Sequence, residues 1–142
     1  MRHVVDASVV LRWFVVQEPG AEAAVEWLER LTEDADSLVG PDLLRFEVLG
    51  ALARLQPPRD PDWAGRAFGR FERLGLRLLP TDEEIALRAL ELSRELRVGG
   101  YDAVYLAHAE SLGTSWLTAD QRVARRLEGD PRITSLFAPS ES

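Results

Sequence analysis

The sequence contains no cysteine and no lysine among its 142 residues. Without thiols the chain can form neither disulfides nor thiolate metal sites, and its two histidines, His3 and His108, are too far apart for a local zinc motif. Any bound metal must therefore be held mainly by oxygen. There is also no apolar run of about eighteen residues, and the charged residue Asp6 interrupts the N-terminus early, so neither a membrane span nor a signal peptide is expected. We expect a cytoplasmic protein.

The charge balance limits the kinds of nucleic-acid partner. A formal net charge of -7 argues against a protein that coats nucleic acid through a basic surface, but it does not exclude a nuclease. All 17 basic residues are arginine, which suits phosphate contacts through its planar fork. A GC-rich genome would produce the same bias without any function, and we prefer that explanation.

The pattern of the chain predicts an α/β fold in one domain, residues 1–142. Short apolar runs alternate with helical patterns, which is typical of βα units and a parallel sheet, and a hydrophobic fraction of 46% is ample for a core. Strands are expected at residues 2–6, 37–40, 77–79 and 115–118, with an edge strand within 132–137. Helices are expected at residues 7–16, 21–32, 42–55, 63–74, from 81 onward, 102–112 and 120–127.

Three details of the helices are predicted. The helix over residues 42–55 is apolar nearly all round and should be largely buried. Thr81 and Glu84 have the spacing of a capping box, with Thr81 as the N-cap. Trp13 and Phe14 are expected in the core, with a minor alternative on a dimer or partner surface.

Acidic residues recur at comparable joints of the predicted fold. Asp6, Asp102 and Asp120 each lie where a strand or loop turns into a helix. Aspartate is a favoured N-cap, so each could simply be a cap. However, the carboxyl ends of strands lie at the edge where open α/β sheets bind ligands, so carboxylates meeting there would form an anionic pocket that needs a cation.

Glu47 is harder to explain as a structural residue. It is expected within a buried helix. A buried carboxylate without a counter-charge either destabilises the fold by several kcal/mol or becomes protonated. Arg45 or Arg54 could provide that charge as an ion pair. A metal shared with the three aspartates would neutralise all four acids at once. Both interpretations remain open at this point.

Four segments of the sequence resemble those of PIN-domain ribonucleases, in particular the VapC-type toxins of bacterial toxin–antitoxin pairs. They occur in the family's order and span the chain. The segments are Val4-Val5-Asp6-Ala7-Ser8, Pro41-Asp42-Leu43-Leu44-Arg45-Phe46-Glu47-Val48-Leu49, Tyr101-Asp102-Ala103-Val104-Tyr105-Leu106-Ala107 and Leu117-Thr118-Ala119-Asp120.

The resemblance implies a three-layer α/β/α sandwich and an acidic quartet that holds Mg²⁺ or Mn²⁺. The quartet consists of Asp6, Glu47, Asp102 and Asp120, and Ser8 and Thr118 match hydroxyl residues that support it. Asp6 and Asp102 are expected as direct ligands, Glu47 as the residue that holds or deprotonates the attacking water, and Asp120 as completing the shell or a second ion site. The family often has an aromatic residue shortly after Asp120, where this chain has Arg122-Val123-Ala124.

Two groups of arginines are candidates for contacting the RNA backbone. Arg122, Arg125 and Arg126 follow Asp120 closely and are the better candidates, whereas a solvated face is the preferred interpretation for the stripe Arg66, Arg70 and Arg73. His108 is six positions after Asp102, turned away from it on a helix, and is expected to be structural.

The sequence thus predicts a metal-dependent endoribonuclease, the toxin of a type II toxin–antitoxin pair. The resemblance implies an RNA substrate, a cognate antitoxin and a homodimer. The alternatives are a PIN-like nuclease that acts on DNA or in RNA processing without an antitoxin, and a PIN-like binding module without catalysis.

Overall fold

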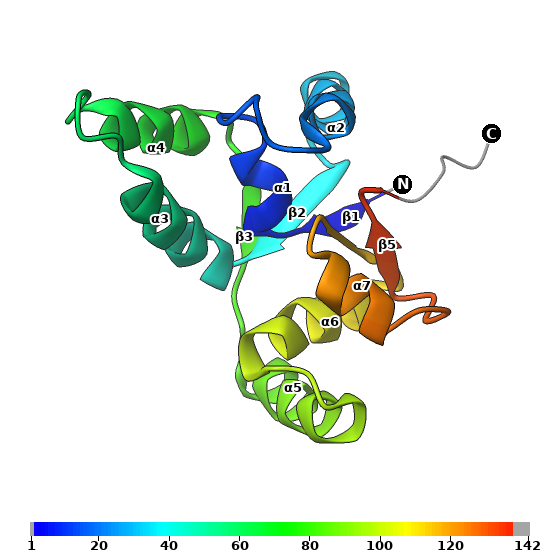
Figure 1. Cartoon of the computed structure of the whole chain (residues 1–142). Coiled ribbons are helices and arrows are strands. Elements are labelled where there is room, and N and C mark those ends of the chain that lie inside the picture. The colour runs from blue at the N-terminus through cyan, green and yellow to red at the C-terminus, as the bar shows by residue number, and fades with distance from the viewer. Residues whose placement is uncertain (1, 138–142) are drawn as a thin grey trace.

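The computed structural model of the protein describes residues 2–137. Its strands form one sheet in the order β3-β2-β1-β4-β5, and every neighbouring pair is parallel (Figure 1). The strands are β1 (His3–Val5), β2 (Leu38–Pro41), β3 (Arg77–Leu79), β4 (Trp116–Thr118) and β5 (Ile133–Ser135). The predicted parallel sheet is confirmed, because each strand lies within two residues of its expected position.

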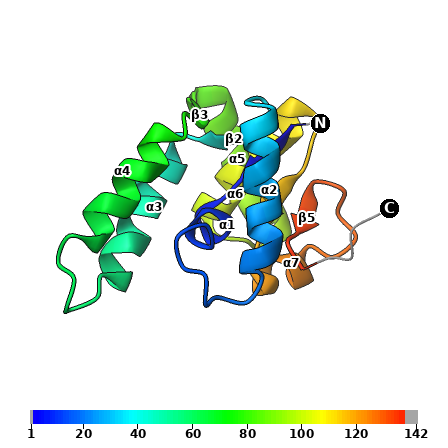
Figure 2. The same ribbon diagram turned by 90° about the horizontal axis from the view of Figure 1, so that it is seen from above.

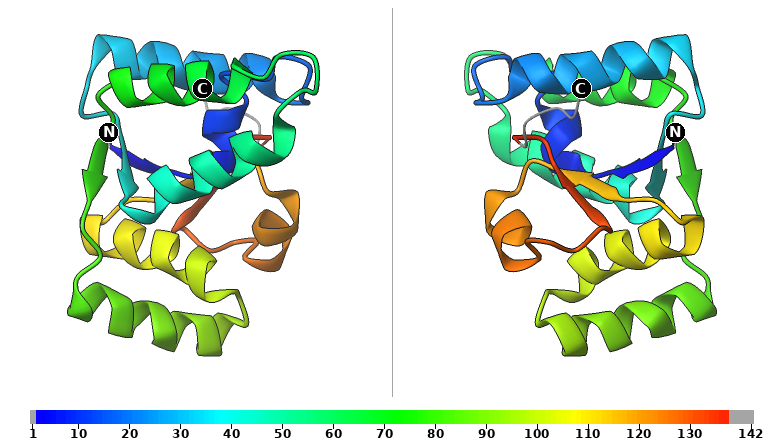
Figure 3. Two further views of the ribbon diagram at one scale, coloured as in Figure 1. Left: turned by 90° about the vertical axis from the view of Figure 1, so that its left-hand side faces the viewer. Right: turned by 90° about the vertical axis from the view of Figure 1, so that its right-hand side faces the viewer.

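Helices cover both faces of this sheet, which confirms the three-layer α/β/α architecture (Figure 3). Val5 and Leu117 pack among α1–α4 on one face, and their neighbours Val4 and Trp116 pack among α5–α7 on the other, as strand alternation requires. None of the helices within residues 2–137 is long and apolar enough to cross a membrane. The helices are α1 (Ala7–Leu11), α2 (Ala21–Glu33), α3 (Leu43–Leu55), α4 (Trp63–Arg73), α5 (Glu83–Leu96), α6 (Gly100–Leu112) and α7 (Gln121–Arg126).

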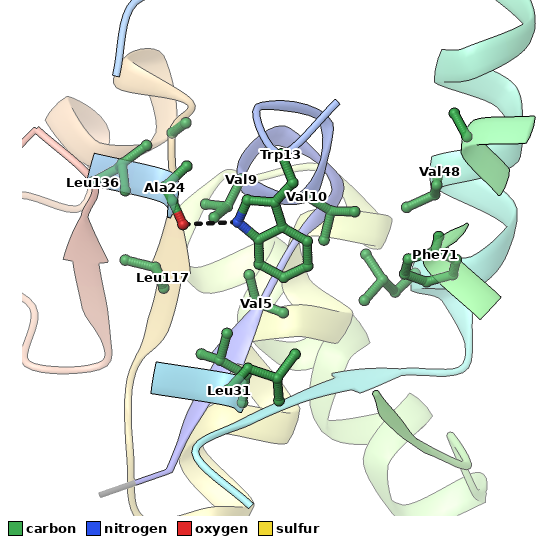
Figure 4. Packing of buried hydrophobic residues seen from close by; sticks show 14 of the residues in the cluster. Val5, Val9, Val10, Trp13, Ala24, Leu31, Val48, Phe71, Leu117 and Leu136 are labelled. Carbon is green, nitrogen blue, oxygen red and sulfur yellow. Dashed lines mark hydrogen bonds between the residues drawn. The ribbon is translucent and has the colours of Figure 1, made fainter. Parts of the chain in front are cut away.

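Trp13 lies in the core between α1 and α2, as predicted (Figure 4). Its indole N–H donates to the Ala24 carbonyl at 2.8 Å. The α1 helix nevertheless ends at Leu11, so the prediction of a helix to residue 16 was wrong. Backbone N–H groups of Trp13 and Phe14 bond three residues back instead of four, which tightens the chain into turns that carry Trp13 toward α2.

The prediction that α3 is largely buried was wrong. Its buried residues, among them Leu44 and Val48, follow one stripe, whereas Phe46 is 64% and Leu49 is 48% exposed. The reason is that α3 packs on α1 and α4 at one side of the molecule and leaves its remaining surface to solvent (Figure 2). An apolar sequence on a helix therefore did not indicate full burial here.

Two predicted helix starts were also wrong. Asp82, not Thr81, is the N-cap of α5, and it accepts from the Ile85 N–H at 2.9 Å. Thr81 instead donates its hydroxyl to Asp42 at 2.7 Å. The α6 helix begins at Gly100 with Gly99 as its N-cap, so Asp102 lies in the first turn and caps nothing.

The strand order places a topological switch point between β1 and β4. From β1 the chain builds outward through β2 and β3 on one side, and β4 and β5 are added on the other. Ligands of open α/β sheets bind outside the carboxyl ends of the strands at such a point. Asp6 directly follows β1 and Asp120 comes two residues after β4, so both acids lie at this position.

Candidate active site

Asp6 is buried and its carboxylate accepts five hydrogen bonds. One oxygen accepts from the backbone N–H groups of Ser8 (3.0 Å) and Val9 (3.4 Å) and from the Ser8 hydroxyl (2.5 Å). The other accepts from the Trp116 indole at 2.9 Å and the Thr118 hydroxyl at 2.6 Å. Burial raises the pKa of Asp6, and these donors oppose the increase. Asp6 is thus a cap of α1, as predicted, and also a link to β4.

The hydroxyls of Ser8 and Thr118 both support Asp6. Each hydroxyl has one proton and donates it to Asp6, so the 3.4 Å contact between the two hydroxyl oxygens is not itself a hydrogen bond. The lone pairs that remain accept the backbone N–H of Ala119 at 2.9 Å (Ser8) and of Asp120 at 3.1 Å (Thr118). This chain of bonds joins the ends of β1 and β4.

Glu47 lies half-buried on α3, and neither arginine considered as its counter-charge is shown to neutralise it. Arg45 pairs with Glu72 at 2.5 Å, and no ion pair of Arg54 is found within residues 2–137. The pKa of Glu47 is raised by burial and then by the charges of Asp6 and Asp102. Within the described residues, the buried Tyr105 hydroxyl has no partner at hydrogen-bond distance, but it lies near enough to Glu47 to favour the ionised form and lower its pKa.

Asp102 is partly buried in the first turn of α6. Its carboxylate forms no hydrogen bond or ion pair with any residue of the described range 2–137. Its pKa is raised by burial and by the charges of Asp120 and Asp6, while the Arg122 guanidinium lowers it. The charges of both neighbours therefore act on Asp102, and a carboxylate with unused lone pairs is suited to binding a ligand.

Asp120 is the N-cap of α7, as the cap interpretation predicted. One of its carboxylate oxygens accepts from the backbone N–H groups of Arg122 at 3.0 Å and Val123 at 3.3 Å. Its other oxygen forms no hydrogen bond with the residues that the structure describes. Capping and ligand binding therefore do not exclude each other at Asp120.

Two buried aromatic residues outside the predicted site, Tyr105 and Trp116, act on Glu47 and Asp6. Tyr105 of α6 and Trp116 of β4 are buried and stacked, with ring centroids 5.4 Å apart and planes inclined by 18°. Trp116 donates to Asp6, and Tyr105 faces Glu47. A buried indole or phenol usually needs a polar partner, which is the one signal in the sequence that could have identified them.

The donor set is suited to a hard divalent cation, with water completing the coordination. No three acidic or histidine side chains within residues 2–137 lie close enough to hold one ion directly. Mg²⁺ usually keeps several waters and binds through one or two carboxylates, so it does not need three. The oxygens of Asp102 are available, whereas binding to Asp6 would require the Ser8 or Thr118 hydroxyl to rotate away, since its other donors are fixed.

A comparison with protein families identifies the chain. A model of the PIN domain matches residues 3–129. The protein belongs to the PIN-domain family. Among characterised proteins, this PIN domain is 30% identical to ribonuclease VapC3 of Pyrobaculum aerophilum over 129 residues, covering 89% of this chain and 95% of the relative.

Solved structures agree with this PIN fold. A toxin–antitoxin complex from Klebsiella pneumoniae matches with a TM-score of 0.67 at 16% identity, over 96% of this chain and 99% of that one. VapBC2 from Rickettsia felis, solved with a DNA fragment from its promoter, matches with a TM-score of 0.70 at 12% identity, over 95% of this chain and 98% of that one. A protein from Pyrobaculum aerophilum matches with a TM-score of 0.68 at 23% identity, over 96% of this chain and 84% of that one.

The remaining predicted residues are distributed around the PIN domain. Arg122 and Arg126 line a cavity beside Asp102, whereas Arg125 lines a different one. Arg66 pairs with Asp60 at 2.5 Å on the surface, which fits the solvated interpretation of that stripe. His108 is buried, with its Nε2 at 2.9 Å from the Thr81 hydroxyl, as expected of a structural histidine.

Proposed function

We propose that this PIN-domain protein is a metal-dependent endoribonuclease and the toxin of a type II toxin–antitoxin pair. One observation carries the proposal: Asp6 and Asp120 follow the adjacent strands β1 and β4 at the switch point, where the Thr118 hydroxyl bonds both the Asp6 carboxylate and the Asp120 backbone N–H. Burial and the charges of neighbouring acids raise the pKa of Glu47 and of Asp102, and a bound cation would offset such unfavourable charge. The similarity to a ribonuclease supports RNA as the substrate.

Each acid has a separate role in this proposal. Asp102 and Asp6 would hold Mg²⁺ or Mn²⁺ directly, and Asp120 would complete the shell through water; the ion would supply positive charge at the scissile phosphate and lower the pKa of bound water. Asp102 contributes unused oxygens, and Asp6 is fixed by its five donors and sets the geometry. Because its pKa is raised, Glu47 is a better proton acceptor than an ordinary carboxylate, so it orients the attacking water and takes its proton.

Cleavage assays test the enzyme proposal. Purified protein is incubated with structured RNA and with single-stranded DNA, in Mg²⁺, in Mn²⁺ and in chelator. RNA should be cut only with metal, and Asp102→Asn should reduce the rate at least about 100-fold, since it removes a charge that contacts the reacting centre. Cleavage of DNA alone would favour the DNA-directed alternative. If neither polymer is cut and Asp102→Asn alters no binding, the chain is a binding module.

An antitoxin and a second copy of the chain complete the proposal. One structural neighbour was solved as a toxin–antitoxin complex and another as VapBC2. Phe46 and Leu49 are exposed on either side of Glu47, and such apolar surface is typical of protein contacts. We further propose that the protein acts on RNA in the cytoplasm. Light scattering after size exclusion, with and without the product of the neighbouring gene, tests both partners.

A further inference from the structure

A cavity of about 320 Å³ opens beside Asp102, between the α5–α6 turn and α7. Three arginines line it, namely Arg97, Arg122 and Arg126, together with Val98 and Val123. Asp102 lies on the wall of this cavity and is also electrostatically coupled to Asp6 and Asp120. The cavity therefore shares Asp102 with the group of acids, and three of its lining residues are arginines.

The three arginines are not held in ion pairs within the part of the chain that the structure describes, although the charge of Arg122 acts on Asp102. The Nε of Arg126 donates to the Leu96 carbonyl at 3.4 Å, which leaves its terminal nitrogens available. By contrast, Arg88 and Arg132 share Glu110 at 2.7 and 2.9 Å. In a chain with a net charge of -7, a cavity with three arginines and one aspartate carries a local positive charge that suits an anionic ligand.

Arg97 occupies a backbone position that favours glycine. It is the C-cap of α5 with φ 55° and ψ 46°, in the left-handed region where most helix ends place glycine or asparagine. A non-glycine residue pays about 1 kcal/mol for this conformation. Two glycines follow shortly after at positions 99 and 100, so the chain places an exposed arginine where the backbone prefers a glycine. The side chain at this position is therefore a candidate for a role outside the fold.

We propose that this cavity binds a backbone phosphate of the RNA strand next to the scissile bond, a site that rests on the proposed function. Guanidinium groups pair with phosphate through two parallel hydrogen bonds. The acids alone would repel the polyanion, and the arginines on one flank offset this repulsion and orient the strand. The lining residues include no aromatic side chain on which a base could stack, so the contact reads the phosphate and not the sequence.

Binding measured in chelator tests the subsite without cleavage. The probe is a fluorescein-labelled 12-nucleotide oligouridylate, with inorganic phosphate as the competitor that identifies a site for the free anion. Arg97→Gly and Arg126→Gln are compared with Arg77→Gln, which removes the same charge from an exposed position on the edge strand β3. Each cavity variant should lower the salt slope by about 0.7, which corresponds to a roughly fivefold rise in Kd at 0.1 M salt. Arg77→Gln should leave both the salt slope and the Kd nearly unchanged.

Arg97→Gly separates binding from folding. Because glycine relieves the left-handed strain, this variant should melt at the same temperature as the wild type or higher while it binds RNA more weakly. With metal present, the cavity variants should raise KM and leave kcat within about twofold, since they remove uniform binding. Equal Kd values for Arg97→Gly, Arg126→Gln and Arg77→Gln would overturn the subsite. Full displacement of the oligonucleotide by inorganic phosphate would also overturn it, because it would identify a site for the free anion and not for an RNA strand. Failure of the wild type to cut RNA would instead overturn the proposed function, and the binding comparison would still be decisive for the cavity.

Discussion

Asp6 and Asp102 are the same residue type in the same site, but their environments differ. Asp6 is buried under five donors, while Asp102 has no bonded partner in the part of the chain that the structure describes. The Asp6 carboxylate is therefore part of the packed interior, whereas the Asp102 carboxylate is bonded to none of the described residues. Variants of the two should therefore separate stability from activity.

At Asp102 the raised pKa predicts a pH-dependent stability. The folded state holds this proton more tightly than the unfolded chain, so the contribution of Asp102 to the unfolding free energy falls as pH rises above about 4. The Asp102→Asn variant has no titrating group at this position, so its unfolding free energy does not decrease in this way. In chelator, its melting temperature minus that of the wild type should be near zero below pH 4 and grow to about 1–3 °C by pH 7. A difference that is constant with pH would contradict the shift, and Glu26→Gln on the exposed surface of α2 is the control.

Trp116→Phe and Trp13→Phe form a matched pair. Both tryptophans are buried indoles that donate one hydrogen bond, at 2.9 and 2.8 Å, but Trp116 bonds the Asp6 carboxylate and Trp13 a backbone carbonyl. Bonds to charged groups are stronger, so Trp116→Phe should lose about 1 kcal/mol more stability in urea unfolding. It should also reduce RNA cleavage, whereas Trp13→Phe should not. Equal cleavage by the two folded variants would remove any positioning role from Trp116.

Residue roles were predictable from the sequence where they are local. The caps by Asp6 and Asp120 act within three residues, and both were expected. The bond from Trp116 to Asp6 spans 110 residues, and the pairing of Arg45 with Glu72 depends on how α3 meets α4. Such contacts follow from tertiary packing, which no local pattern encodes.

At the scale of elements, Gly40 shows how closely β2 and α3 pack. A Cβ at this position would clash with the end of the Leu44 side chain and lie 3.3 Å from its Cβ, and Leu44 is fully buried. Gly40→Ala should therefore cost about 1–3 kcal/mol of unfolding free energy. The control is Gly50→Ala on α3, where a Cβ meets nothing within 4 Å and a gain of about 0.5–1 kcal/mol is expected. Chemical denaturation measures both, and a neutral Gly40→Ala would show that Leu44 can move.

Element boundaries were less predictable than element types. The strands were placed correctly because apolar runs flanked by breakers are a local signal. The early end of α1, the exposure of Phe46 on α3 and the start of α6 at Gly100 all depend on what each helix packs against. The start of α6 decides the role of Asp102. Because α6 begins two residues earlier than predicted, Asp102 is not its N-cap, and its carboxylate is bonded to none of the described residues.

For the whole molecule, the repulsion among the acids predicts that metal stabilises the fold. An ion that binds only the folded state at about 100 times its Kd adds about 2.7 kcal/mol, or roughly 5–10 °C in Tm for a chain of this size. Thermal unfolding with 10 mM Mg²⁺ or Mn²⁺ against chelator measures this shift. Asp102→Asn should remove most of it, and Glu26→Gln should keep it. An unchanged Tm for the wild type would argue against a shared ion site.

The fold as a whole was the most predictable feature, since the alternation of strands and helices determines a parallel sheet, and with it the edge where ligands bind. The cavity beside Asp102 was not predictable, because its arginines come from α5 and α7. Arg122 and Arg126 were candidates from the sequence, but the pattern could not separate them from Arg125 or add Arg97.

The five bonds to Asp6 also decide how an inert form of this protein should be made. Replacing Asp6 would leave an indole, two hydroxyls and two amides without their shared acceptor inside the molecule. A lack of activity in an Asp6 variant could then mean either that catalysis is lost or that the protein is unfolded. Asp102→Asn removes no such acceptor. It is therefore the safer inactive variant for capturing bound RNA from cells in which the active protein would be toxic.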